Sequence, residues 1–262
     1  MTEWNASEYE RISALQAAMA DEAVSLLNLR GTERVLDIGC GQGRITREIA
    51  SRLPTGHVVG VDASEKMIAL AREHAATSPQ PNLEFAVVDV RHLTFYNEFD
   101  LVVSFNALHW IPEQTLALKS IRAAIRPTGV AQLRLVPRGE RKSLENVIEE
   151  IRLSPRWAQY FTGFHDPYLH LAPAEYAALA EQHDFKVVRN HTADKSWDFQ
   201  SRAAFAAFGS VTFVEWTQHL PELSRPDFVS DVLDRYQKIA CTSPGEENYF
   251  RFYQMDIRLA PA

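Results

Sequence analysis

In the first half of the chain, short apolar runs alternate with longer segments whose apolar residues recur at helical spacing. The short runs are rich in β-branched residues, which is typical of buried strands. We therefore expect strands at 34–39, 57–62, 83–89, 99–106 and 130–136. The helical pattern predicts helices at 5–29, 44–53, 64–76 and 116–125. Strands that alternate with helices predict a parallel sheet covered on both faces.

The second half of the chain has a different pattern. Residues 140–183 have a helical pattern that prolines interrupt at Pro155, Pro167 and Pro173. We expect strands at 184–199 and 248–260, with helices between them. Parallel strands followed by an antiparallel partner are common in mixed sheets.

These elements predict one α/β domain over residues 1–262, because the length fits a single domain with an insertion. Its core is expected at about 30–136, 184–199 and 246–260. The N-terminal helix and the insertions are expected to form a helical lid from residues 1–29, 138–180 and 200–243.

Composition narrows the class of protein. Apolar residues make up 46% of the chain and charged residues 23%, which is the balance of a globular protein. The net charge of −7 argues against a nucleic-acid partner, because such a partner usually requires a basic surface. Cys40 and Cys241 are too far apart for a disulfide framework or a zinc motif, so no metal is expected. No apolar run reaches the length of a membrane span, and the stretch MTEWNASEYERIS is too polar for a signal peptide. We therefore expect a cytoplasmic protein, monomeric or homodimeric, without a membrane partner.

The stretch VLDIGCGQGR, residues 35–44, carries the clearest chemical signal. A strand that enters a glycine-rich turn and then a helix points backbone N–H groups at a ligand. Arg44 stands where a dinucleotide fingerprint requires its third glycine. Asp37 would repel a pyrophosphate but would favour a cationic ligand. A tight turn without a ligand is the alternative interpretation.

Two further aspartates end the second and third expected strands. Asp62 follows the loop by about 20 residues, where an acidic side chain can accept hydrogen bonds from ribose hydroxyls. Asp89 could accept from an adenine amino group, with Val90 against the ring. Each aspartate could instead be a helix N-cap, although Ser64 is the better cap beside Asp62.

Taken together, VLDIGCGQGR, GVDAS and VVDV resemble the cofactor motifs of class I S-adenosylmethionine-dependent methyltransferases. IRPTGVAQLRL is similar to the helix–turn–strand element that follows in that family, and the resemblance covers residues 30–136. It implies a doubly wound, Rossmann-like, seven-stranded, mostly parallel sheet with an antiparallel last strand. It also implies S-adenosylmethionine as the cofactor. The positive sulfonium and α-ammonium groups of this cofactor would explain why the acidic Asp37 precedes the glycine loop.

The resemblance assigns cofactor contacts by position. Gly39 and Gly41 would lie along the methionine part, and Asn106 would face the methyl donor. The nucleoside part would contact Asp62, Ala63, Met67, Asp89 and Val90.

Two segments outside these motifs concern the methyl acceptor. WNxSxY at the N-terminus resembles bacterial trans-aconitate methyltransferases, whereas Tyr9, Gln16 and the sequence LHW (108–110) resemble insect juvenile hormone acid methyltransferases. Both groups methylate carboxylates, and the second resemblance implies that Gln16 and Trp110 hold the acceptor carboxylate. A carboxylate is ionised at neutral pH and needs no general base, so alignment for in-line transfer would suffice. Trp110 as a core aromatic and Gln16 as a solvated helix residue are the alternatives.

The leading hypothesis is therefore methyl-ester formation on a small, apolar organic acid. Eleven aromatic residues in the later half of the chain, most of them in the expected insertions, favour an apolar acceptor; they are Trp157, Tyr160, Phe161, Phe164, Tyr168, Trp197, Phe199, Phe205, Phe208, Phe213 and Trp216. A tricarboxylate acceptor stays open because of Arg138, Arg141, Arg152 and Arg156. A natural-product O-, N- or C-methyltransferase with His109 as general base is another alternative, and a catalytically silent binding protein is a third.

Overall fold

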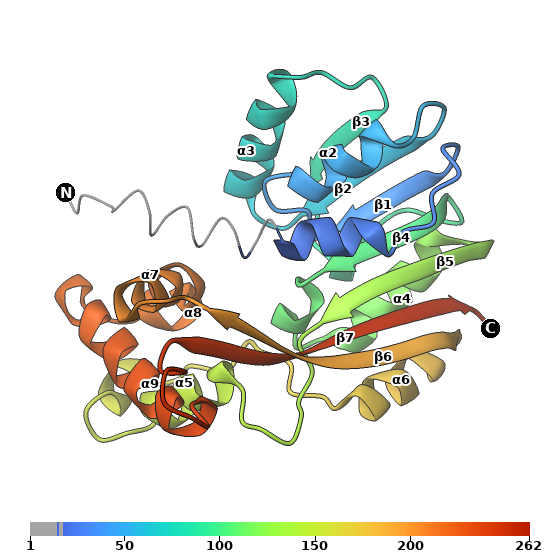
Figure 1. Cartoon of the computed structure of the whole chain (residues 1–262). Coiled ribbons are helices and arrows are strands. Elements are labelled where there is room, and N and C mark those ends of the chain that lie inside the picture. Colours follow the sequence, from blue (N-terminus) through green and yellow to red (C-terminus); the bar gives the residue numbers. More distant parts are fainter. Residues whose placement is uncertain (1–14, 16–17) are drawn as a thin grey trace. The chain divides into compact units, whose positions relative to one another are not determined.

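The structure is a computed structural model that describes Leu15 and residues 18–262 (Figure 1). The described chain divides into two compact units. The sheet unit comprises Ala20–Pro137, Leu169–Ala193 and Gln254–Ala262, and the helical unit comprises Arg138–Tyr168 and Asp194–Tyr253 together with the described residues up to Met19.

Seven strands of the described chain form one sheet in the order β3-β2-β1-β4-β5-β7-β6. The strands are β1 (Arg34–Ile38), β2 (His57–Asp62), β3 (Leu83–Val87), β4 (Phe99–Phe105), β5 (Ile125–Leu135), β6 (Phe185–Asp198) and β7 (Tyr249–Pro261). β1 pairs in parallel with β2 and β4, β2 with β3, and β4 with β5, whereas β5 and β7 are antiparallel. The predicted fold class, a mostly parallel sheet with an antiparallel last strand, is confirmed.

Helices cover both faces of this sheet within the sheet unit. On one face, Ala23 of the helical segment 18–25 packs with Ile49 of α2 (Arg44–Ser51) over β1, β2 and β4. α3 (Glu65–Ala76) lies beside α2, and Figure 1 shows the two helices together. On the other face, α4 (Gln114–Ala124) and α6 (Pro173–Glu181) enclose the main apolar cluster.

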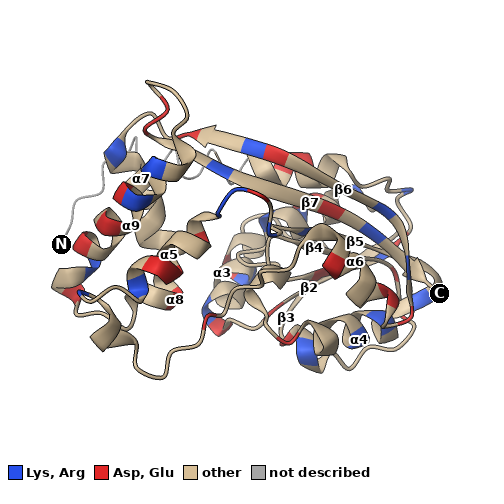
Figure 2. Cartoon of the chain, turned by 90° about the horizontal axis from the view of Figure 1, so that it is seen from below, with Lys and Arg blue, Asp and Glu red and all other residues tan. Residues whose placement is uncertain are grey.

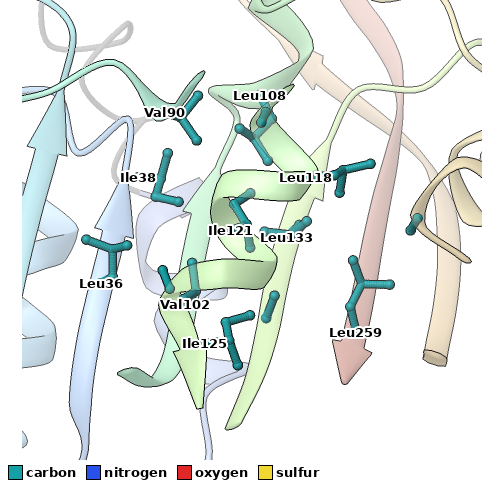
Figure 3. Close-up of a cluster of buried hydrophobic side chains, with 14 of the residues drawn as sticks. Leu36, Ile38, Val90, Val102, Leu108, Leu118, Ile121, Ile125, Leu133 and Leu259 are labelled. Carbon is teal, nitrogen blue, oxygen red and sulfur yellow. The ribbon is translucent and has the colours of Figure 1, made fainter. Parts of the chain in front are cut away.

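The main apolar cluster explains why the central strands are almost continuously hydrophobic. Ile38, Val102 and Leu133 come from three adjacent strands and pack against Leu118 and Ile121 of α4 (Figure 3). All five residues are at most 2% exposed. Burial of this kind stabilises the fold by roughly 1.5–3 kcal/mol for each large aliphatic side chain. The cluster fixes the strand ends on which the predicted site residues lie.

Some element boundaries differ from the sequence-based expectation. The third strand ends at Val87 rather than residue 89, because Asp89 caps the short 3-10 helix η1 (Val90–His92). β5 begins at Ile125, and a register shift opposite Phe99 and Leu101 accommodates the PTG turn that was expected to precede the strand. The N-terminal helix ends at Ser25, earlier than expected.

The helical unit contains helices and the outer ends of β6 and β7. Its helices are α5 (Leu144–Arg152), η3 (Ala158–Phe161), α7 (Arg202–Thr212), α8 (Val214–Thr217), η4 (Glu222–Ser224) and α9 (Arg225–Ala240). Figure 2 shows residues of both charges along α9. The helical pattern expected over 140–183 is therefore discontinuous, and Pro173 begins α6 instead of breaking a helix, since proline is tolerated in the first turn.

Aromatic residues form the core of the helical unit. Trp157 packs edge-to-face on Phe228, and Phe199 stacks on Phe205, with ring centroids 5.2 and 4.9 Å apart. Of the eleven aromatic residues singled out from the sequence, seven are buried: Trp157, Phe161, Tyr168, Phe199, Phe205, Phe213 and Trp216. Their burial means that aromatic content alone does not argue for an apolar acceptor.

Candidate cofactor and acceptor site

The glycine loop follows β1 and begins α2. Gly39, Gly41 and Gly43 have φ values of 70°, 54° and 77°, in the left-handed region that favours glycine. A Cβ on Gly39 would lie 2.2 Å from that of Ala107, whereas a Cβ on Gly41 would meet nothing within 4 Å. Gly39 is therefore required for packing against the segment after β4, while Gly41 borders open space that a ligand could enter.

Asp37 lies on β1 just before the loop and is only 2% exposed. Its carboxylate accepts a 2.7 Å hydrogen bond from the hydroxyl of Thr46. Burial raises the pKa of Asp37 to about 7, the Thr46 hydrogen bond opposes this rise, and the charge of Asp62 adds to it. A buried carboxylate in this state would be stabilised by a nearby cation, which fits a cationic ligand.

Asp62, at the end of β2, connects the glycine loop to α3. One carboxylate oxygen accepts from the Gly41 N–H and the other from the Ser64 N–H, both at 2.9 Å. Ser64 is the N-cap of α3, as expected, because its hydroxyl accepts from the Met67 N–H. A carboxylate offers about four acceptor positions. Asp62 therefore retains capacity for ribose hydroxyls, and the neighbouring Ala63 and Met67 are exposed.

Asp89 was interpreted from the sequence either as an acceptor for an adenine amino group or as a helix N-cap, and the structure shows the cap. It caps η1 through the Arg91 N–H, and its carboxylate also forms an ion pair with the Arg91 guanidinium. This hydrogen bonding keeps the pKa of Asp89 below its usual value. Arg91 also pairs with Glu113, and Val90 is buried in the main apolar cluster. An adenine amino group would therefore have to share Asp89 with Arg91.

Asn106 directly follows β4 and adopts a left-handed conformation, with φ 57°. Its N–H donates to the carbonyl of Arg134 at 2.9 Å, which ties the end of β4 to β5. Its side-chain Oδ1 is buried and has no hydrogen-bond partner in the described chain. An unpaired buried acceptor is unfavourable, so a ligand donor such as an ammonium group fits this position.

His109 and Trp110 lie together in η2 (Leu108–Trp110), with ring centroids 5.8 Å apart. His109 is 4% exposed, and burial lowers its pKa to about 3. The Val136 N–H donates to its Nδ1 at 3.3 Å, so the neutral ring carries its proton on Nε2. Trp110 is half-buried, which leaves part of the ring accessible. Tyr9 and Gln16, the other predicted acceptor residues, lie outside the described residues.

Sequence reasoning did not identify three residues that organise this site. Thr46 holds Asp37, Arg91 holds Asp89, and Arg134 is a fully buried guanidinium on β5. Arg134 pairs with Asp256 on β7 and with Glu22 of the helical segment 18–25. The one charged residue in the run VAQLRLV was the available signal for Arg134.

The arrangement fits S-adenosylmethionine by several independent features. Asp37 supplies a buried carboxyl group that a cation would ionise, Asn106 an unpaired acceptor, and Gly41 an unobstructed approach to the loop. These features lie at the carboxyl ends of β1 and β4, where α/β sheets of this kind bind ligands.

Comparison with known proteins agrees with this fit. Residues 35–129 match the family described as methyltransferase domain. A trans-aconitate 2-methyltransferase from Deinococcus radiodurans is 29% identical over 258 residues, which is 95% of each chain. The corresponding protein from Streptomyces avermitilis is 33% identical over 181 residues, or 67% of each chain.

Solved structures share the fold at lower sequence identity. The YcgJ protein from Bacillus subtilis superposes with a TM-score of 0.67 at 16% identity, covering 94% of this chain and 99% of its own. An O-methyltransferase from a Brevibacillus brevis polyketide synthase, in complex with S-adenosyl-L-homocysteine, gives a TM-score of 0.61 at 14% identity, with 97% and 75% covered.

The chain belongs to the class I S-adenosylmethionine-dependent methyltransferases, and it is an enzyme with S-adenosylmethionine as its cofactor. Within the part of the chain that the structure describes, no helix is long and apolar enough to cross a membrane. The same residues contain no cluster of histidine, cysteine and acidic side chains suited to a metal ion.

Proposed function

We propose that this methyltransferase methylates the carboxylate of a small organic acid and produces a methyl ester. The observation that carries the proposal is the state of His109, the candidate general base. Its ring is buried, its Nδ1 accepts a backbone N–H, and its pKa is lowered to about 3. A histidine in this state is a poor general base near neutral pH, which favours an acceptor that is already ionised, such as a carboxylate.

The bound cofactor supplies an electrophilic methyl group on a sulfonium sulfur. Asp37 and Asn106 would bind the charged amino acid part, and Gly39 and Gly41 would let the backbone approach it. Asp62 with Ala63 and Met67 would hold the ribose, and Asp89 and Val90 the adenine. Trp110 would orient the acceptor carboxylate through its indole N–H together with Gln16, because a neutral donor aligns an oxygen without quenching it as a guanidinium pair would.

Charge pairing in the helical unit favours an acid with one carboxylate over a tricarboxylate. Of the four arginines considered for a tricarboxylate, Arg141 pairs with Asp194 and Arg152 with Glu149. Arg156 pairs with both Asp227 and Asp231 on α9. These three guanidinium groups already have carboxylate partners and are less suited to bind two or three further carboxylates.

A tricarboxylate acceptor is the second candidate. It is favoured by the similarity to proteins named trans-aconitate 2-methyltransferase, of which the Streptomyces avermitilis protein is 33% identical. The two candidates share the carboxylate chemistry and differ in the number of charged groups to be bound.

A transfer assay with labelled methyl donor tests the proposal. Fatty, isoprenoid, aromatic and tricarboxylic acids would be compared with phenols and amines of similar size. We expect base-labile labelled methyl esters from an acid. Transfer to a phenol or an amine, with none to any acid, would contradict the proposal.

We further propose that the enzyme is cytoplasmic, is monomeric or homodimeric, and acts without nucleic acid or membrane. Cell fractionation would test its location, and size-exclusion chromatography would test its oligomeric state.

A further inference from the structure

Gln254 on β7 has a side chain that the proposed mechanism does not use. It is 1% exposed, and neither its Nε2 nor its Oε1 has a hydrogen-bond partner in the described chain. Burial of an amide without partners is unfavourable, and methionine would fill nearly the same volume without that disadvantage. An amide at such a position therefore points to a ligand that completes its hydrogen bonds.

The strand register places Gln254 near the proposed acceptor. Met255 pairs with Leu135, the last residue of β5, so Gln254 lies beside the following residue, Val136. The Val136 N–H is the donor to His109, the neighbour of Trp110 in η2. Gln254 is thus at the carboxyl end of β5, at the edge of the sheet where His109 and Trp110 lie.

The side of the sheet on which Gln254 lies follows from its neighbours. Asp256 pairs with Arg134 across the strands, with nitrogen–oxygen distances of 2.8 and 3.1 Å. Side chains two residues apart share one face of a strand, so Gln254 is on the same face as Asp256 and Arg134. The backbone carbonyl of Arg134 accepts from the Asn106 N–H. Asn106 follows β4 and Gln254 lies on β7, so these two residues, both with unpaired amide atoms, come from the strands on either side of β5.

The Arg134 guanidinium already binds carboxylates of the protein, so it is not the donor that would bind an acceptor carboxylate. Its guanidinium is bound by the carboxylates of Asp256 and Glu22. This group contains one cation and two anions, so it offers a further carboxylate no net attraction. A carboxylate acceptor at this edge would depend on neutral donors, of which the Gln254 amide is one.

We propose that Gln254 binds the methyl acceptor and selects acids that carry a hydroxyl group. Its Nε2–H donates to the carboxylate, and its Oε1 accepts from a hydroxyl next to that carboxylate. A carboxylate alone has no donor for Oε1, whereas a hydroxy acid satisfies both amide atoms. The inference rests on the proposed carboxylate chemistry and narrows its substrate class to hydroxy acids.

Matched acid pairs that differ by one hydroxyl group test this inference. Suitable pairs are phenylpropionate with phenyllactate and tricarballylate with citrate. In the unmodified enzyme, kcat/KM for the hydroxy acid of the better pair should be at least about tenfold higher, because a site built to bind a hydroxyl rejects the analogue that lacks it. Gln254→Met should reduce this ratio to about one. Its affinity for S-adenosylhomocysteine should not change, and its melting temperature should be equal or higher.

Gln132→Met is the matched control. Gln132 is also nearly buried and lies on the same face of β5 as Arg134, but its register partner is Arg258, farther from the carboxyl end of β5. This variant should keep the preference for the hydroxy acid.

Three outcomes would overturn the inference. They are equal kcat/KM values for both members of each pair, an unchanged preference in Gln254→Met, and failure of both Gln254→Met and Gln254→Leu to fold. If Gln254→Met has a lower melting temperature and an unchanged preference for the hydroxy acid, the Gln254 amide binds a structural water instead of the acceptor. If no acid in the panel is methylated, the proposed function fails, and that result is distinct from a panel in which acids react without regard to the hydroxyl.

Discussion

Thr46, in the first turn of α2, donates a 2.7 Å hydrogen bond to the buried carboxylate of Asp37 on β1. This single neutral donor does not offset burial, and the pKa of Asp37 is raised from 3.8 to about 7. A raised pKa means that the folded protein binds the proton more tightly than the unfolded chain does. The stability of the ligand-free enzyme should therefore fall as pH rises from about 4 through about 7.

The same titration should control cofactor affinity with the opposite sign. A cationic ligand favours the ionised form of Asp37, so the dissociation constant of S-adenosylmethionine should be about tenfold lower at about pH 8 than at about pH 6. Calorimetry in buffers with different ionisation enthalpies should detect proton release on binding near neutral pH. Asp37→Asn should bind weakly at every pH without proton release. A pH-independent dissociation constant in the unmodified enzyme would exclude this coupling.

The two glycines of the loop should respond differently to alanine. Gly39→Ala places a Cβ 2.2 Å from that of Ala107 at a φ of 70°, so the variant should unfold at a markedly lower temperature. Gly41→Ala meets no atom within 4 Å, and its cost should be limited to the strain of its φ, roughly 1–3 kcal/mol. We expect Gly41→Ala to fold but to bind S-adenosylhomocysteine more weakly. Thermal unfolding and titration calorimetry on both variants would reveal the contrast, and a Gly41→Ala variant with normal affinity would contradict it.

Asp62 and Ser64 offer a test that separates ligand binding from helix capping. Asp62→Ala removes an acceptor of the Gly41 N–H as well as the proposed ribose acceptor, and each hydrogen bond to a charged group contributes about 1.5–3 kcal/mol. Its affinity for S-adenosylhomocysteine should fall by at least about tenfold. Ser64→Ala removes the α3 cap alone and should cost about 0.5–2 kcal/mol of stability with normal affinity. Equal affinity losses in the two variants would show that Asp62 acts only through the helix.

The sheet was predictable because its signals are local. The apolar runs, the glycine loop and the Ser64 cap depend on residues close together in sequence, and the structure has β1, β2, α2 and α3 where those signals place them. Periodicity alone could not give the ends of β3 and β5. A cap at Asp89 and a register shift opposite Phe99 determine them, and both depend on the surrounding backbone.

The candidate site was only partly predictable for the same reason. Asp37, Asp62 and Asp89 could be named from their places at strand ends, but their partners Thr46 and Arg91 depend on side-chain geometry. The state of His109 follows from a backbone donor at Val136, 27 residues away, and from burial by the fold. Arg134 becomes a neighbour of the site through the parallel pairing of β5 with β4, and Gln254 through the antiparallel pairing of β7 with β5. Such long-range contacts have no signature in a local pattern.

Trp110 and His109 provide the last prediction, which concerns the chemical step. With the pKa of His109 at about 3 and its Nδ1 bound to the Val136 N–H, no histidine titration should appear in kcat between about pH 6 and 9. An acid acceptor stays ionised over this range, so the pH profile of kcat should be flat.

Substitutions at the two residues then separate orientation from base catalysis. Trp110→Phe keeps a ring but removes the indole N–H, so kcat should fall by about tenfold or more through misalignment of the acceptor, while affinity for S-adenosylhomocysteine stays the same. His109→Asn keeps an acceptor for the Val136 N–H and should retain most of the turnover. Single-turnover rates for both variants at several pH values would decide the question. A rate that rises through a histidine pKa near its usual value of about 6.5 and is lost in His109→Asn would identify a general base, and with it a phenol or amine acceptor.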